Sequence, residues 1–135
     1  MYNNNNERVL NILRQAKTFF FATVDGDQPN VRPFNAVVMF EDKIYFYTNN
    51  HKHAFKQMMT NPRVELCAVI SEERWIRVTG KAVFDYRSDV KKAMLDANPE
   101  LRKIYSEDDK IFEVFYLSNM SAKIHSLNAE PETIC

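Results

Sequence analysis

The chain has 135 residues, a length that fits one domain with a substantial core, so we expect residues 1–135 to form a single domain. Its 18 lysines and arginines balance its 18 aspartates and glutamates, so its overall charge favours neither nucleic acid nor an anionic membrane surface as a partner. Only two glycines are present, which excludes the G-x-G-x-x-G and P-loop motifs of dinucleotide and nucleoside triphosphate binding.

The two cysteines exclude a disulfide framework and a Cys/His metal cluster. Cys67 lies in the apolar run 64–70, where we expect a buried free thiol, and Cys135 ends the chain, where we expect a mobile residue. The first seven residues lack the basic and apolar regions of a signal peptide, and no apolar stretch approaches the roughly 18 residues that span a bilayer. We therefore expect a cytoplasmic protein that does not enter a membrane.

The first half of the chain predicts one helix followed by three strands. Asn6 is a candidate helix cap, because apolar residues between positions 9 and 16 recur at helical spacing after it. β-Forming residues then predict strands over residues 18–24, 30–40 and 44–48, with turns at Asp25-Gly26 and at 41–43. Strands joined by such short turns are expected to be antiparallel neighbours, because a parallel pair needs a long crossover.

The second half continues the same pattern. Residues 52–60 predict a short helix that ends at an Asn-Pro pair, Ser88 is a candidate cap for a helix over 89–97, and Pro99 restarts a helical turn. Apolar runs between turn residues predict four further strands, over residues 63–70, 75–86, 111–117 and 122–127. Gly80 inside the second of these indicates a β-bulge or a close backbone approach. Six or seven mostly antiparallel strands with helices at their ends describe a closed or partly closed barrel.

Arg32 is the first candidate binding residue. It stands beside Pro33, which cannot donate to a β-ladder, so this stretch is expected at a sheet edge or a bulge. Free amides there could face the carbonyl and ring nitrogens of a ligand. The alternative is an ordinary exposed arginine on an edge strand.

Thr48, Asn49 and Lys52 form a second candidate group where a strand ends and a helix begins. Unpaired amides, the positive end of the helix and a nearby ammonium all favour a phosphate at such a place. The alternative is that Asn49 caps the helix and Lys52 is solvated.

Trp75 and Arg77 form a third group, because residues two apart on a strand point to the same face. An aromatic ring beside a cation suits a flavin or another planar anionic ligand, although Trp75 alone is also a natural packing anchor. His51 and His53 face different ways at a helix start and make a poor metal pair, so we expect no metal site. No nucleophile or paired-carboxylate motif assigns a catalytic residue.

The order and spacing of the blocks 21–34, 45–52, 61–64 and 75–80 carry a family resemblance. From about residue 7 to residue 126, the chain resembles the pyridoxamine 5′-phosphate oxidase-like, FMN-binding split-barrel superfamily. It is most similar to short members of the NimA/NimC-like and general-stress-protein-like groups.

The resemblance implies a mainly β fold with a few peripheral helices, a six-stranded antiparallel Greek-key split β-barrel that works as a homodimer with FMN at the subunit interface. It implies that residues 32–35 lie along the isoalloxazine ring, that Thr48 and Lys52 bind the phosphate, and that the strand of Trp75 reaches the flavin, in some members from the partner subunit. The predicted cofactor-binding residues are Arg32, Pro33, Phe34, Asn35, Tyr47, Thr48, Asn49, Lys52, Trp75 and Arg77.

The chain also departs from the family pattern. Residues 127–135 contain no Trp or Arg, so a true pyridoxamine phosphate oxidase is not expected, and the basic pair after residue 48 is replaced by His51, Lys52 and His53. The resemblance implies an FMN-dependent oxidoreductase that passes electrons from reduced nicotinamide to a small organic acceptor, such as a nitroaromatic or a quinone. The alternatives are a non-catalytic flavin- or haem-binding protein for sensing, storage or redox buffering, a protein that binds the 5-deazaflavin cofactor F420, and a cofactor-free interaction module.

Overall fold

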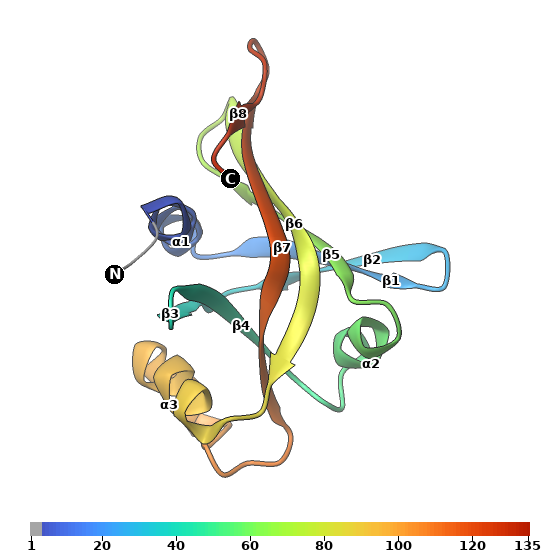
Figure 1. Ribbon diagram of the computed structural model, residues 1–135, viewed down its shortest axis with the longest axis vertical. Helices are drawn as coiled ribbons and strands as arrows, with labels where there is room; N and C mark the ends of the chain where they lie inside the picture. The colour runs from blue at the N-terminus through green and yellow to red at the C-terminus, as the bar shows by residue number, and fades with distance from the viewer. Residues whose placement is uncertain (1–3) are drawn as a thin grey trace.

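The computed structural model describes residues 4–135, which form one eight-stranded sheet flanked by helices (Figure 1). The elements in chain order are α1 (Asn4–Ala16), β1 (Phe19–Asp25), β2 (Gln28–Phe34), β3 (Val38–Phe40), β4 (Lys43–Asn49), α2 (His53–Thr60), β5 (Arg63–Val69), β6 (Arg74–Asp85), α3 (Ser88–Ala97), the 3₁₀ helix η1 (Pro99–Lys103), β7 (Phe112–Ser126) and β8 (Glu132–Thr133).

The sheet is strongly curved and does not close. Its strands follow the order β2-β1-β5-β6-β7-β4-β3, with β8 added to β7, and every pair is antiparallel. Among the described strands, β2 and β3 at the two ends of this order do not pair with each other, although only residues 35–37 separate them in the chain. This arrangement confirms the predicted mainly β, antiparallel split barrel, with short β3 and β8 bringing the number of strands to eight.

The stretch expected as a single strand over 30–40 is divided into β2 and β3, so that prediction was wrong. β2 pairs with β1 and β3 pairs with β4, and the chain crosses from one end of the sheet to the other between them. Ala36 and Val37 in this link are buried, which explains why it reads as a strand from its composition. The three strands expected as consecutive neighbours are therefore two separate hairpins.

The two strands expected over 111–117 and 122–127 are instead one long strand, β7. Asn119 within it has a φ of 52° and, with Met120, stands opposite Gly80, while pairing with β6 continues on both sides. The register between these strands shifts at Gly80, where a Cβ atom would lie 2.8 Å from the Cβ atom of Leu117. The bulge and close approach predicted at Gly80 are confirmed.

Several predictions at helix and chain ends were wrong. Asn6 lies inside α1, where its Nδ2 donates to the Asp42 carbonyl at 2.8 Å, and Ser88 is the first residue of α3 rather than its cap. Cys135, expected to be mobile, is tied to β7, since its carbonyl accepts from the Ala122 amide at 3.0 Å and Ile134 is buried beside it. Cys67 is free as predicted but only half-buried, and burial raises the pKa of its thiol.

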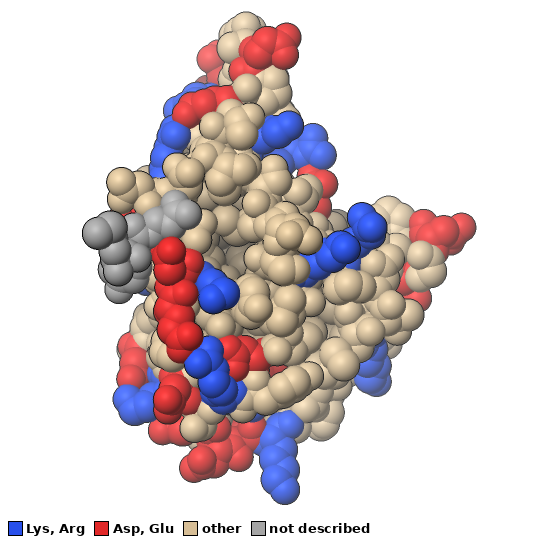
Figure 2. All heavy atoms as spheres, viewed as in Figure 1, with Lys and Arg blue, Asp and Glu red and all other residues tan. Residues whose placement is uncertain are grey.

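Aromatic side chains fill the barrel. Phe21, Phe46 and Phe115 contact one another with ring centroids 5.6 to 5.7 Å apart, and Phe34 stacks on Phe21 at 4.5 Å. A second cluster lies between α3, η1 and the ends of β4 and β7. Charged side chains gather around the rim of the face shown in Figure 2, whose centre is mostly uncharged. None of the helices within residues 4–135 is long and apolar enough to cross a membrane.

Candidate functional site

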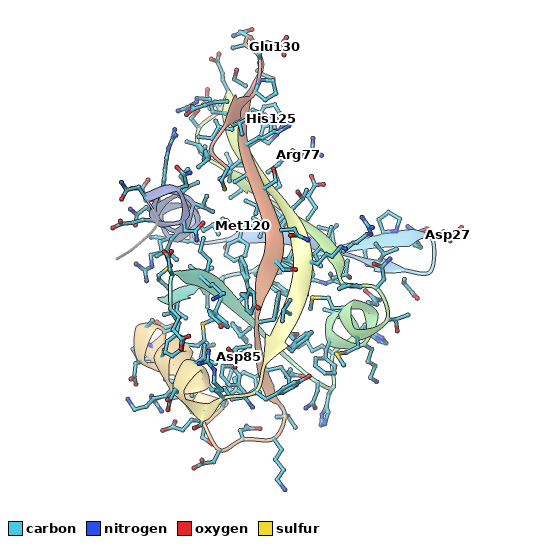
Figure 3. The ribbon with its side chains drawn as sticks, in the orientation of Figure 1. Asp27, Arg77, Asp85, Met120, His125 and Glu130 are labelled. Carbon is cyan, nitrogen blue, oxygen red and sulfur yellow. The ribbon has the colours of Figure 1, made fainter. Side chains whose placement is uncertain are left out.

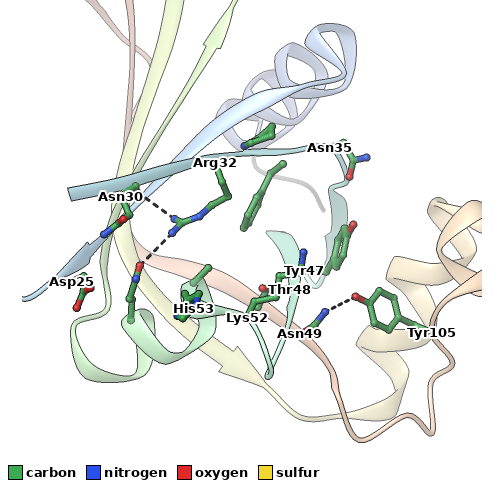
Figure 4. A pocket seen from close by; sticks show the side chains of 14 residues that line it. Asp25, Asn30, Arg32, Asn35, Tyr47, Thr48, Asn49, Lys52, His53 and Tyr105 are labelled. Carbon is green, nitrogen blue, oxygen red and sulfur yellow. Dashed lines mark hydrogen bonds between the residues drawn. The ribbon is translucent and has the colours of Figure 1, made fainter. Parts of the chain in front are cut away.

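A pocket of about 600 Å³ opens where β2 leaves the sheet, between the end of β2, the end of β4 and the start of α2 (Figure 4). It brings together eight of the ten predicted cofactor-binding residues: Arg32, Pro33, Phe34, Asn35, Tyr47, Thr48, Asn49 and Lys52. Six of these residues lie on β2 and β4, on either side of the split in the barrel, whereas Asn35 follows β2 and Lys52 precedes α2. The pocket therefore exists because the sheet does not close.

Local structure explains why these side chains meet. β2 is an end strand of the sheet, and Pro33, which offers no amide hydrogen, is compatible with a strand that lacks a partner on one side. Arg32 lies opposite Phe21 in the β1–β2 register and shares its inward face, so a cation occupies a position where the strands otherwise place aromatic residues. On the other wall, β4 ends at Asn49 and α2 begins four residues later.

The Arg32 guanidinium is held by neutral groups. Its Nη1 donates to the Thr23 hydroxyl at 2.8 Å and to the Phe21 carbonyl at 3.1 Å, and its Nη2 donates to Oε1 of Gln57 at 3.2 Å. Among residues 4–135 no carboxylate lies within ion-pair distance of this guanidinium. Partial burial lowers the pKa of Arg32, because it removes water from around the charged guanidinium.

The start of α2 adds positive charge at the same end of the pocket. Lys52 precedes the helix in an extended conformation and makes no side-chain cap, so the first amides of α2 keep their capacity to donate. His53 and Ala54 in the first turn also line the pocket. A helix start beside the exposed Lys52 and the uncompensated Arg32 favours an anion at this end.

Aromatic and amide groups form the other end. Tyr47 is half-buried with its ring centroid 6.1 Å from that of Tyr105, and Asn49 Nδ2 donates to the Tyr105 hydroxyl at 2.8 Å. Burial, and then the neighbouring Tyr105, raise the pKa of Tyr47, so this phenol stays neutral and can donate a hydrogen bond. Thr48, between Tyr47 and Asn49 in β4, points to the opposite face of the strand and is 4 % exposed.

Six lining residues lay outside the predicted cofactor-binding set: Asp25, Asn30, His53, Ala54, Gln57 and Tyr105. Gln57 lies one helical turn after His53, so its place beside the pocket follows from the helix period once α2 is located. Tyr105 follows η1 and reaches the pocket only through the tertiary packing of the second cluster, for which the sequence offers no local signal.

Trp75 and Arg77 lie outside the pocket of their own chain. Figure 3 places Arg77 and His125 on the long β6–β7 ribbon away from α2, and the Trp75 ring stacks on that of His125 at 5.8 Å. Arg77 is exposed and its Nε pairs with a Glu65 carboxylate oxygen at 2.6 Å. Among residues 4–135 no three His, Cys, Asp or Glu side chains are grouped as a metal site would require.

Comparisons with known proteins agree with this architecture. The family model described as pyridoxamine 5′-phosphate oxidase matches residues 6–134. A NimC/NimA family protein from Clostridium acetobutylicum is 43 % identical, with a TM-score of 0.90 over 96 % of this chain and 91 % of that protein. No curated protein sequence matches the chain.

Two more distant structures share the fold. General Stress Protein 26 from Bacillus anthracis is 18 % identical with a TM-score of 0.74, over 97 % of this chain and 99 % of that one. A pyridoxamine 5′-phosphate oxidase-related, FMN binding protein from Nostoc punctiforme is 18 % identical with a TM-score of 0.65, over 93 % and 83 % of the two chains. The family match across nearly the whole sequence and the 43 % identical relative show that this chain belongs to the pyridoxamine 5′-phosphate oxidase family, as its sequence motifs indicated.

Proposed function

We propose that the chain binds FMN in the pocket between β2, β4 and α2, and acts as an oxidoreductase. The observation that carries the proposal is the polarity of this one pocket, which has Arg32, Lys52 and a helix start at one end and the side chains of Tyr47 and Asn49 at the other. FMN has the matching chemistry, a phosphate dianion joined to a planar ring with hydrogen-bonding edges. The FMN binding protein from Nostoc punctiforme, which shares the fold, supports the same assignment.

In this proposal Thr48 and Lys52 hold the phosphate together with Arg32, which the family resemblance had placed along the isoalloxazine ring, while residues 33–35 and Tyr47 lie along that ring. Bound FMN would supply hydride and single-electron transfer, and the protein residues would orient it and limit the access of water. Reduced nicotinamide is the proposed electron donor, and a nitroaromatic or a quinone is the proposed acceptor. The NimC/NimA relative at 43 % identity supports a place among the short members of the family.

A second copy of the chain is proposed to complete the site. Trp75, Arg77, Phe20 and Val31 share the outer face of the sheet, as the strand registers require, because paired residues of neighbouring strands point the same way. Val31 is 67 % exposed and Phe20 is 48 % exposed there. Exposed apolar residues on the same face as Trp75 and Arg77 suit a homodimer in which each chain presents these two residues to the pocket of its partner.

Pyridoxamine phosphate oxidase activity itself is not proposed. Residues 127–135 carry no Trp or Arg, and their last part folds back on β7 through β8 and Ile134. This segment therefore has no cationic side chain that could bind the phosphate of pyridoxamine 5′-phosphate.

The absorption spectrum of the purified protein tests the proposed cofactor, recorded before and after incubation with excess FMN and gel filtration. Retained flavin bands support the proposal and justify assays with NADH, NADPH and a panel of nitroaromatic and quinone acceptors. A Soret band would instead indicate haem. A protein that retains no FMN would contradict the assignment, and titration with F420 would then test the deazaflavin alternative.

Replacing Thr48 and Lys52 together by alanine is expected to weaken FMN binding by about 1–3 kcal/mol, because each substitution removes a contact to the charged phosphate. Isothermal titration calorimetry measures the change. Lys56→Ala is the matched control, because Lys56 is an exposed lysine of α2, four residues after Lys52, that does not line the pocket. Unchanged affinity in the double variant would show that the phosphate lies elsewhere.

A further inference from the structure

Arg32 belongs to a closed ring of three hydrogen-bonded side chains from β1, β2 and α2. Its Nη1 donates to Thr23 Oγ1 at 2.8 Å, its Nη2 donates to Gln57 Oε1 at 3.2 Å, and Thr23 Oγ1 donates to the same Gln57 oxygen at 2.5 Å. The Phe21 carbonyl accepts a further bond from Nη1 at 3.1 Å. Because each bond of the ring joins a different pair of elements, the guanidinium can neither turn nor withdraw without breaking several contacts.

The ring occupies only one edge of the guanidinium. All the contacts of Arg32 within residues 4–135 are made by Nη1 and Nη2, and Nε donates to none of the described residues. The occupied edge is the terminal one, so the lateral edge, where Nε–H and one Nη2–H run parallel, has a free Nε–H among residues 4–135, and Arg32 lines the pocket. This lateral fork is the geometry with which arginine pairs two oxygens of a phosphate or carboxylate at once.

The ring also preserves the charge of Arg32. Thr23 and Gln57 accept hydrogen bonds without carrying a negative charge, whereas an Asp or Glu at either position would neutralise the guanidinium before a ligand arrived. Figure 4 shows Arg32 at the margin of the pocket, and the hydrogen bond from its Nη2 to Gln57 Oε1 links this margin to α2.

We propose that Thr23 and Gln57 are positioning residues that hold Arg32 as a two-pronged receptor for a phosphate monoester, and so set the preference of the pocket for FMN over riboflavin. This inference rests on the proposed function, but it assigns a role to two residues that need not contact the isoalloxazine ring system of FMN. Thr23 is the sharper test, because it is 1 % exposed and does not line the pocket. Any effect of Thr23 on ligand choice must therefore pass through Arg32 or Gln57.

The test compares the dissociation constants of FMN and riboflavin for wild-type protein, Thr23→Val and Thr23→Ser, measured by flavin fluorescence quenching. Valine keeps the shape of threonine and removes the hydroxyl, whereas serine keeps the hydroxyl. We expect Thr23→Val to reduce the preference for FMN over riboflavin at least fivefold, and Thr23→Ser to leave it within twofold of wild type. Riboflavin affinity should be unchanged in both, since riboflavin has no phosphate.

A double-mutant comparison separates positioning from loss of structure. In an Arg32→Met background, Thr23→Val should have no further effect on the preference, because the group that it positions is gone. An equal effect with and without Arg32, or an unchanged preference in Thr23→Val, would overturn the inference. A general weakening of both flavins would also overturn it, because that pattern indicates damage to the pocket rather than to the phosphate receptor.

Failure of the proposed function would be recognised separately. If the wild-type protein binds neither flavin, the FMN assignment fails, and inorganic phosphate then becomes the probe of the receptor. The ¹H–¹⁵N signal of Arg32 Nε should shift on phosphate addition at lower concentrations in wild type and Thr23→Ser than in Thr23→Val. An Nε signal that does not respond to phosphate in any of the three proteins would overturn the inference.

Discussion

Lys91 and Glu113 are two charged residues that are almost completely buried. At the residue scale, they show how strongly the stability of the protein can depend on one ion pair. Lys91 on α3 is 8 % exposed and Glu113 on β7 is 5 % exposed, with Nζ and Oε1 separated by 3.9 Å. Burial raises the pKa of Glu113, and the Lys91 charge only partly opposes this. Removing one partner of such a pair leaves the other charge buried and uncompensated.

We predict that Lys91→Met lowers the free energy of unfolding by about 3–5 kcal/mol near pH 8. The loss should shrink toward acid pH. A carboxyl group with a raised folded-state pKa contributes stability that is fully present below its ordinary value of 4.5 and is lost as the pH rises through the raised value. Losing Lys91 raises the pKa of Glu113 further, so the stability of the variant falls more steeply than that of wild type as the pH rises. Urea unfolding at pH 5 and pH 8 measures both effects.

Lys92→Met is the control, since Lys92 is exposed and its pair with Asp96 lies at the surface. We expect it to change stability little at either pH. A Lys91→Met protein as stable as wild type at pH 8 would show that Glu113 is not left as a buried charge.

At the scale of elements, the bulge at Gly80 sets how closely β6 approaches β7. A Cβ atom at this position would lie 2.8 Å from the Leu117 Cβ atom and 3.1 Å from the Ser118 carbonyl oxygen. Neither neighbour is the end of a flexible side chain, so the strands themselves must move apart. Because these two strands form the longest pairing in the sheet, the shift would be passed along both.

Gly80→Ala is therefore expected to destabilise the protein by about 1–3 kcal/mol, as an overpacked contact does. Thr79→Ala, at an exposed neighbouring position of the same strand, should stay within about 0.5 kcal/mol of wild type. Guanidinium unfolding of the two variants measures the difference. Equal stability of Gly80→Ala and wild type would mean that the bulge accepts a side chain after all.

At the scale of the whole molecule, the proposed homodimer makes a prediction about the outer face of the sheet. Val31 on β2 is 67 % exposed, and contact with a second copy of the chain would remove this apolar side chain from water. We expect wild-type protein to elute at the mass of a dimer, and Val31→Asp to elute as a folded monomer. Gel filtration with light scattering measures the masses, and circular dichroism checks the fold.

Ile104→Asp is the matched control, because Ile104 is exposed to the same degree, 68 %, but lies next to η1 rather than on the sheet. This variant should remain dimeric. A monomeric wild type, or a dimeric Val31→Asp, would remove the proposed role of the partner's Trp75 and Arg77.

The sequence predicted much of this molecule because many of its signals are local. The strand and helix periods located most elements to within a few residues, and the unusual cation in β2 and the strand-to-helix junction after Thr48 pointed to residues that line one pocket. Signals that depend on distant partners were missed. The buried crossing at 35–37 was read as part of a strand, and the irregularity at Asn119 was read as a break although pairing with β6 continues on both sides. Tyr105 reaches the pocket only after η1 has packed.

The split between the two hairpins also orders events in folding. β1 and β2 form one hairpin and β3 and β4 form another, and each can pair through a short local turn, whereas β1–β5 and β4–β7 join segments far apart in the chain. Distant pairings form late because their loops must be closed first. Arg32 comes from one hairpin and Tyr47 from the other, so neither hairpin alone carries the pocket. A ligand of this pocket therefore stabilises only chains in which both hairpins are in place.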